Sequence, residues 1–266
     1  MSDYYTREAE YRLHAALNQS ALKPLRKSPL HAKHATDNPV KQTPAMALGV
    51  LTERIIAVPD DLRAERKADG RTKEGKAQAE QAEAFGILLV SPDDWQRAEV
   101  MAANVLASKQ AQELLSGCEY GVPCYWTVGG QQRKALFDAV DTARHRIVDI
   151  KTTSAELTAD SLARTAAQYG YHIQAAWYRQ GYAAVHGVVP EFWFLFVESA
   201  APHAVVAVQL DDDWLAEAAD EVETMAAVWQ QCADAGIWPG PAEMMADAGK
   251  LTLTRPRYAQ AYTVGE

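Results

Sequence analysis

The sequence predicts a mixed α/β or α+β protein in which helices flank a mixed sheet of about five strands. Apolar residues recur at helical spacing over the first 115 residues, and segments rich in Val, Tyr, Trp and Ile follow between 118 and 152. A long helical pattern then precedes two more strand-like segments. We expect one domain over 1–266, with a basic helical region at 1–90, a core at about 91–235 and a tail at 236–266.

The N-terminal elements are expected from capping residues and apolar spacing. Asn18 or Ser20 is a suitable N-cap for the first helix. Ser91 followed by Pro92 begins a later helix, and Gly117 should end it. Residues 59–75 are polar and are expected to form a loop. The helices predicted in this region are one through Leu22 and Leu25, 45–56, 76–85 and 92–115.

The strand segments lie in the second half of the chain. Gly129 and Gly130 separate the first two and indicate a hairpin. The predicted strands are 118–128, 132–140, 145–152, 191–198 and 203–210, and the predicted helices are 162–186 and 211–235.

The charge of the chain at first argues against a nucleic-acid partner. The formal net charge is −9, whereas phosphate binding depends on Lys and Arg. The charge is uneven, however: residues 1–76 carry 14 Lys and Arg against 10 Asp and Glu. We therefore expect a positive surface near the functional site, contributed by the N-terminal region.

The remaining composition excludes several classes of protein. Cys118, Cys124 and Cys232 fit neither a disulfide framework nor a zinc or iron–sulfur site, so a reduced cytoplasmic location is expected. The N-terminus lacks the features of a signal peptide. No apolar segment approaches the roughly 20 residues needed to span a bilayer, so no membrane association is expected.

The most informative residues are Asp138, Asp149 and Lys151. Asp149 and Lys151 are two apart on a predicted strand and therefore share one face. Asp138 lies on the preceding strand, which a hairpin would place alongside. Two converging carboxylates suit Mg²⁺ or Mn²⁺, and a neighbouring Lys can orient water or stabilise a phosphate. The alternative is a surface ion pair on an edge strand.

This pattern resembles the core of the PD-(D/E)XK nuclease superfamily, which has a restriction-endonuclease-like fold. The rest of the chain resembles the RecE-type (exonuclease VIII) and phage lambda exonuclease branch. Five motifs of that branch have matching segments here, in this order along the chain. They are S-x-L-x-x-L-x-x-S-P-x-H at 17–31, G-x-x-x-(H/E) at 48–53, D-R-R-T-K-E-G-K at 69–76, the core aspartates with D-x-K at 137–138 and 149–153, and Q-x-x-x-Y at 174–178.

Two positions depart from the pattern of the family. Glu53 stands where RecE-type proteins usually have His, although lambda-type relatives place an acid there. Phe137 stands where the superfamily name expects Pro. The first departure would replace an imidazole by a carboxylate near the metal, and the second does not touch the chemistry.

The resemblance implies a role for each residue of the core. Asp138, Asp149 and the Ile150 carbonyl would bind the metal, and Lys151 would position the attacking water and the phosphate. Glu53 would approach the metal from its helix, although a Glu on a helix is more often solvated. The other implied site residues are Glu119, with a surface charge as the alternative, and Gln174, whose helix could instead pack an aromatic stripe on the sheet.

A second set of residues is implied in binding DNA. Hydroxyl and cationic groups near a helix start form a reasonable anion site, and a polar segment can close on DNA. Capping by the serines, solvated charge and aromatic packing are the alternatives. The residues of this set are Ser20, Arg26, Lys27, Ser28, Arg71, Lys73, Lys76 and Tyr178.

The resemblance implies a Mg²⁺-dependent exodeoxyribonuclease, in which Mn²⁺ can substitute, that digests linear duplex DNA from the 5′ end. It would leave 3′ single-stranded tails, form a ring-shaped homo-oligomer and act with a single-strand annealing protein in phage or prophage recombination. One alternative is a related nuclease of other polarity, of Cas4-like or RecB-like type. Another is a non-catalytic module that binds DNA ends.

Overall fold

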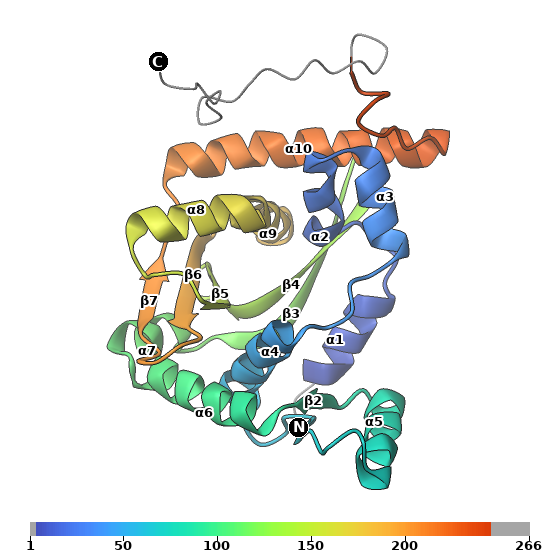
Figure 1. Ribbon diagram of the computed structural model, residues 1–266. Helices are drawn as coiled ribbons and strands as arrows, with labels where there is room; N and C mark the ends of the chain where they lie inside the picture. The colour runs from blue at the N-terminus through green and yellow to red at the C-terminus, as the bar shows by residue number, and fades with distance from the viewer. Residues whose placement is uncertain (1–3, 246–266) are drawn as a thin grey trace, which may run out of the picture.

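The computed structural model describes residues 4–245 and is built around a five-stranded sheet (Figure 1). The strand order is β3-β4-β5-β6-β7; β5 and β6 are parallel, and the other neighbours are antiparallel. The predicted fold class is therefore confirmed. The strands of this sheet are β3 (Glu119–Val128), β4 (Gln131–Asp141), β5 (Arg146–Thr153), β6 (Glu191–Glu198) and β7 (Val205–Val208).

Helices cover both faces of the sheet. Figure 1 shows α8, α9 and α10 on one side, and α4, α6 and α7 on the other. The helices are α1 (Tyr4–Leu13), α2 (Gln19–Leu22), the 3₁₀ helix η1 (Lys23–Arg26), α3 (Pro29–Asp37), α4 (Pro44–Ala57), α5 (Lys73–Phe85), α6 (Pro92–Ala107), α7 (Lys109–Leu115), α8 (Ala159–Tyr169), α9 (Tyr171–His186) and α10 (Asp212–Ala235).

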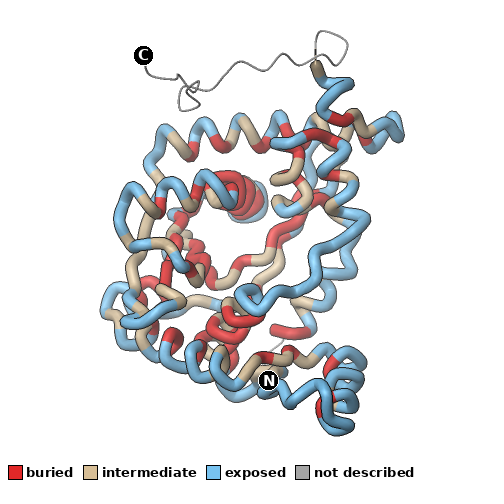
Figure 2. Tube along the Cα trace, in the orientation of Figure 1, coloured by how far each residue is buried: buried red, intermediate tan, exposed pale blue. Residues whose placement is uncertain are grey.

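Side-chain alternation along the strands produces two apolar cores. In β5, Ile147 belongs to the core under α9, whereas Val148 and Ile150 belong to the core under α4 and α6. Residues on one face of a strand are two apart, so Asp149 and Lys151 follow Ile147 onto the α9 side. Figure 2 shows that most of α9 is buried, apart from its exposed C-terminal end, whereas α5 is largely exposed.

The sheet opens between β4 and β5. These strands pair only from Ala139 with Val148 to Asp141 with Arg146. Beyond that point the Ile150 N–H donates to Asp138 Oδ2 at 2.9 Å, so a carboxylate replaces a main-chain acceptor. On the freed side of β4, Leu17 forms an isolated bridge with Arg133. The opening leaves Asp138 and the end of β5 accessible to a ligand.

Two predicted helices are each divided in the structure. Ser108 ends α6 and caps α7 by accepting the Ala111 N–H, so the helix predicted over 92–115 is interrupted. Gly170 adopts a left-handed conformation, φ 65°, between α8 and α9 and divides the helix predicted over 162–186. Helical spacing continues across both breaks, which is why the sequence pattern did not reveal them.

The segment 59–75, which was predicted to be a loop, contains a short strand. β1 (Ala64–Arg66) pairs in parallel with β2 (Leu88–Val90) in a separate two-stranded sheet. The three residues of β1 are mostly polar, so they carry no apolar alternation. The prediction for the tail 236–266 lies outside the described residues from 246 onward.

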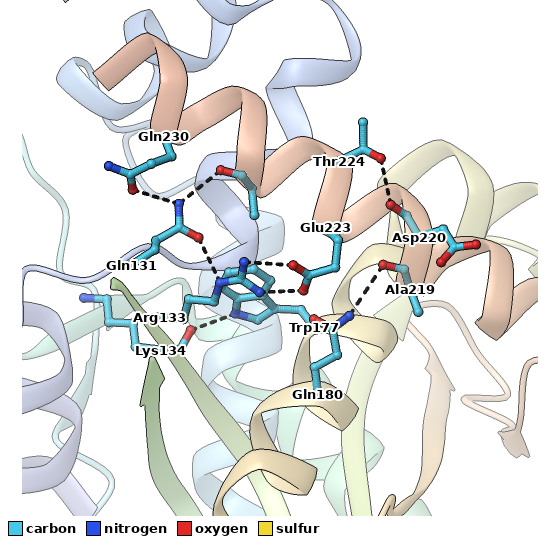
Figure 3. Close-up of polar contacts among 11 residues, drawn as sticks. Gln131, Arg133, Lys134, Trp177, Gln180, Ala219, Asp220, Glu223, Thr224 and Gln230 are labelled. Carbon is cyan, nitrogen blue, oxygen red and sulfur yellow. Dashed lines mark hydrogen bonds and ion pairs between the residues drawn. The ribbon is translucent and has the colours of Figure 1, made fainter. Parts of the chain in front are cut away.

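An ion pair between the buried Arg133 and the exposed Glu223 connects α10 to β4 (Figure 3). Arg133 has a side chain only 4% exposed and binds both carboxylate oxygens of Glu223, at 2.6 and 3.0 Å. Its Nε donates to Gln131 Oε1 at 2.8 Å, and its guanidinium lies 5.2 Å from the centre of the Trp177 ring. The pair is therefore completed by hydrogen bonds and by a cation–π contact.

None of the helices within residues 4–245 combines the length and the apolar character that crossing a membrane requires.

Candidate functional site

The site is centred on Asp149, whose side chain is 0% exposed. Lys151 forms an ion pair with Asp149 Oδ1, and the Gln174 amide of α9 donates to Asp149 Oδ2. The buried Tyr178 hydroxyl interacts in turn with Gln174, and its ring packs edge-on against Phe137 at 5.3 Å. The α9 side chains therefore hold the Asp149 carboxylate in a fixed orientation.

A glycine in α4 brings Glu53 to the same place. A Cβ at Gly49 would lie 3.2 Å from Thr152 Oγ1, so the absence of a side chain allows α4 to approach β5 closely. Glu53 lies one helical turn further on and accepts a hydrogen bond from the Tyr4 hydroxyl at 2.9 Å. The Tyr4 ring packs on Gly121 of β3. The G-x-x-x-E spacing is therefore explained by packing as well as by chemistry.

The carboxylates perturb one another. Burial, and then the charges of Asp149 and Glu53, raise the pKa of Asp138 well above its usual range. Burial also raises the pKa of Glu53, as does the charge of Asp149. Burial would lower the pKa of Lys151, but the charges of Asp149 and Asp138 outweigh it and raise that pKa. The cluster therefore has more negative charge than its one lysine can offset.

A second lysine lies near this cluster. Lys23 of η1 lies over the Tyr171 ring, with its Nζ 5.7 Å from the ring centre, and Lys151 Nζ is 5.2 Å from the same centre. Burial, and then the charge of Lys151, lower the pKa of Lys23 to about 8. Lys23 is the basic residue of the N-terminal region that approaches the site, and it was not among the residues predicted there.

The site opens into a cavity of about 780 Å³. Its walls come from α4, the end of β5 with the loop after it, and the C-terminal end of α8. Glu53, Asp138, Ile150 and Lys151 line it at one place, and Arg97 of α6 adds a further cation. Arg97 is 3.3 Å from Asp94, so part of its charge is already offset.

Several predicted residues lie apart from this cavity. Glu119 is 68% exposed at its side chain, and its carboxylate is 3.8 Å from Arg7. Arg26 donates to the Ala167 carbonyl and lies 3.7 Å from Glu221. Ser28 is buried and caps α3, while Asn18, rather than Ser20, caps α2. Ser20 and Lys27 are exposed.

The segment 69–76 spans the turn before α5 and the first turn of that helix. Thr72 accepts the Gly75 N–H, and Arg71 pairs with Asp69. Lys73 and Lys76 are exposed. None of the basic residues in this segment lines the 780 Å³ cavity, so the structure gives the segment a helix-capping role and leaves its cations in solvent.

Sequence reasoning missed two residues that complete the site. Tyr4 reaches Glu53 from α1, and Lys23 reaches Tyr171 from η1. Neither lies in a motif of the strands. Lys23 lies within segment 17–31, which matches a RecE-type motif, but at a position where that motif accepts any residue.

A mixed five-stranded sheet that opens beside Asp138 and Lys151, with the buried Asp149 between them, has the arrangement of the PD-(D/E)XK nuclease fold. A family model described as a PDDEXK-like domain of unknown function (DUF3799) matches residues 18–248, and the chain belongs to this family. Among the curated proteins, none is similar enough in sequence to match.

Solved structures share the fold. A crystal structure from Eubacterium rectale, described as a putative exonuclease, superposes with a TM-score of 0.65 at 17% identity, covering 96% of this chain and 94% of that one. A phage-related exonuclease from Haemophilus somnus 129PT covers 87% of this chain and 99% of its own, at 11% identity and a TM-score of 0.39. The first similarity supports the fold assignment.

Nucleases of the PD-(D/E)XK group generally use divalent metal ions, and the donors present here fit such an ion. Asp138, Asp149 and Glu53 are oxygen donors with surplus negative charge. Asp149 Oδ1 is buried and contacts the Lys151 ammonium, which occupies the side of the carboxylate that faces the cavity wall. The described residues contain no preformed group of three or more His, Cys, Asp or Glu ligands. The aspartates would therefore hold an ion together with the Ile150 carbonyl and water.

Proposed function

We propose that this protein is a metal-dependent deoxyribonuclease that hydrolyses phosphodiester bonds with Mg²⁺, for which Mn²⁺ can substitute. One observation carries the proposal: Asp138 and Lys151 line a cavity of about 780 Å³ together, and Lys151 forms an ion pair with the buried Asp149 directly behind it. Glu53 and Gln174 converge there from different helices. A scaffold protein would have no need for this set of buried charges.

Each side chain of the site has a distinct part in the proposed reaction. The metal would supply charge neutralisation and a water of lowered pKa. Asp138 and Asp149 would hold it, with Glu53 nearby. Lys151 has a raised pKa and stays protonated, so it would position the water and the scissile phosphate as a cation rather than accept a proton. Gln174 keeps Asp149 oriented.

We further propose that the enzyme is an exonuclease of the RecE and lambda type. In this proposal it digests linear duplex DNA from 5′ ends and leaves 3′ tails for recombination by strand annealing in a phage or prophage system. The order and spacing of the sequence motifs support this branch. A ring-shaped homo-oligomer, a single-strand annealing partner and a cytoplasmic location belong to the same proposal.

The test uses purified protein and linear duplex DNA labelled at one 5′-phosphorylated end. We expect degradation with Mg²⁺, none with EDTA, and loss of activity in Asp149→Asn by about 1000-fold, since metal stabilisation of the transition state amounts to several kcal/mol. Asp160→Asn is the matched control, because Asp160 is exposed at the start of α8 and outside the cavity.

The products then separate the alternatives. Release of mononucleotides from the 5′ end supports the full proposal. Digestion from 3′ ends or nicking of circles would keep the nuclease and reject the branch. DNA binding without any cleavage would reject the enzyme and favour an end-binding module.

A further inference from the structure

Two tyrosines on the cavity wall lie where one continuous helix would not place them. Side chains two apart on a helix point in different directions, yet Tyr169 and Tyr171 both line the 780 Å³ cavity. Gly170 separates them with φ 65° and interrupts the helix between α8 and α9. The break lets the two rings stack, with centres 5.9 Å apart and planes inclined by 25°.

The inner ring is fixed in the site. Tyr171 packs on Phe194 and Phe196 of β6, with ring centres at 5.5 and 6.0 Å. Lys151 Nζ and Lys23 Nζ lie 5.2 and 5.7 Å from the centre of its ring. Tyr171 therefore connects the stacked pair directly to the cation that would position the phosphate.

The outer ring is exposed to the cavity. Tyr169 is 56% exposed, although it rests on Tyr171. A single exposed aromatic residue is common on protein surfaces. This one lines the same cavity as Lys151 and Asp138 and is supported from behind by a fixed ring. It offers a flat apolar surface on the wall of the cavity that Lys151 also lines.

We propose that Tyr169 and Tyr171 form a subsite for one unpaired nucleotide of the strand being cut, with its base stacked on Tyr169 and its phosphate directed toward Lys151. The inference rests on the proposed function and deepens it. A base inside a duplex has both faces covered by its neighbours, whereas an unpaired base has a free face that can stack there. Stacking accepts every base, because each has a π face. The substrate is then a frayed or unpaired end of any sequence.

The test measures the affinity of Asp149→Asn protein, in Mg²⁺, for a labelled duplex with a short unpaired 5′ end. Tyr169→Ala should weaken binding by about 5- to 100-fold, and Tyr169→Phe should retain it. An abasic site is then placed at each unpaired position in turn, and at one of these positions it should weaken the binding of protein that retains Tyr169 by a similar factor. At that position the abasic site should cause no further loss in Tyr169→Ala protein, because the substitution and the abasic site each remove the same contact.

Tyr125→Ala is the matched control, because Tyr125 is also exposed but packs at a tilt against the His14 ring outside this cavity. In the otherwise wild-type enzyme, Tyr169→Ala should raise KM several-fold and leave kcat within a few-fold. Unchanged affinity of Tyr169→Ala, or additive losses at every abasic position, would overturn the subsite. If wild-type protein degrades DNA while Tyr169→Ala binds normally, only the subsite fails. If wild-type protein neither binds nor degrades DNA, both proposals fall.

Discussion

Two clusters of charge adjoin α9, each with one buried member, Arg133 or Asp149, and they are balanced very differently. At the α10 side, Arg133 meets one carboxylate, Glu223, with two hydrogen bonds and further support from Gln131. On β5, Lys151 meets Asp149 while Asp138 and Glu53 crowd the same place. The first cluster is complete by itself, whereas the second has surplus negative charge.

This difference indicates which cluster serves function. A buried ion pair that satisfies its own hydrogen bonds needs no further partner. A cluster that raises the pKa of its own carboxylates is unfavourable for folding unless a cation offsets it. The surplus charge is thus a feature that a divalent ion and a phosphodiester would exploit.

The largest expected effect follows from removing one surplus charge. Asp138→Asn keeps an oxygen that can accept the Ile150 N–H but removes the carboxylate. We expect nuclease activity to fall by about 1000-fold. The free energy of unfolding at pH 8 should stay the same or increase, because the remaining carboxylates lose a like charge. Initial rates on linear duplex and urea denaturation test both, and a large loss of stability would contradict the charge argument.

The opposite outcome is expected at the balanced cluster. Glu223→Ala leaves Arg133 buried without its carboxylate, which should cost about 2 kcal/mol in the free energy of unfolding. Activity per folded molecule should be unchanged, because Glu223 does not line the cavity. Urea denaturation measures the cost, with Glu217→Ala, an exposed residue of the same helix, as the control. Equal stabilities of the two variants would show that the pair contributes nothing.

The smallest expected effect is a pH dependence that appears without metal. The ordinary pKa values of Asp138 and Glu53 are 3.8 and 4.5, and both are raised in the folded protein. Protonation of Asp138 and Glu53 therefore favours the folded state. The stability that it contributes is complete at pH values below their ordinary pKa values, and it is lost as the pH rises through their raised pKa values. The Tm in EDTA should fall by about 2–4 °C between pH 5 and 8.

Metal and mutation should both remove that dependence. Mg²⁺ should restore the Tm at pH 8, and Asp138→Asn should flatten the profile in EDTA. Lys23, whose pKa is lowered to about 8, adds stability only above that pH and does not affect this range. A profile that is the same in wild-type and Asp138→Asn protein would assign the effect to other groups.

Much of the core of the site was predictable, because short-range periodicity decides it. The strand expected at 191–198 is observed as β6, Glu191–Glu198, and β5 places Asp149 and Lys151 on one face. Gln174 contacts Asp149, a position that the resemblance to the family implied and that periodicity did not. Sequence reasoning failed where a break does not change the spacing of apolar residues, as at Ser108 and Gly170.

The sequence by itself determined the local features: the alternation that pairs Asp149 with Lys151, the hairpin that brings Asp138 alongside, and the helices that cover the sheet. The tertiary structure alone decided which distant residues complete the site. Tyr4 and Lys23 reach it because α1 and η1 pack against the sheet and α9, and such contacts depend on close packing of surfaces far apart in the chain. No local pattern encodes that packing.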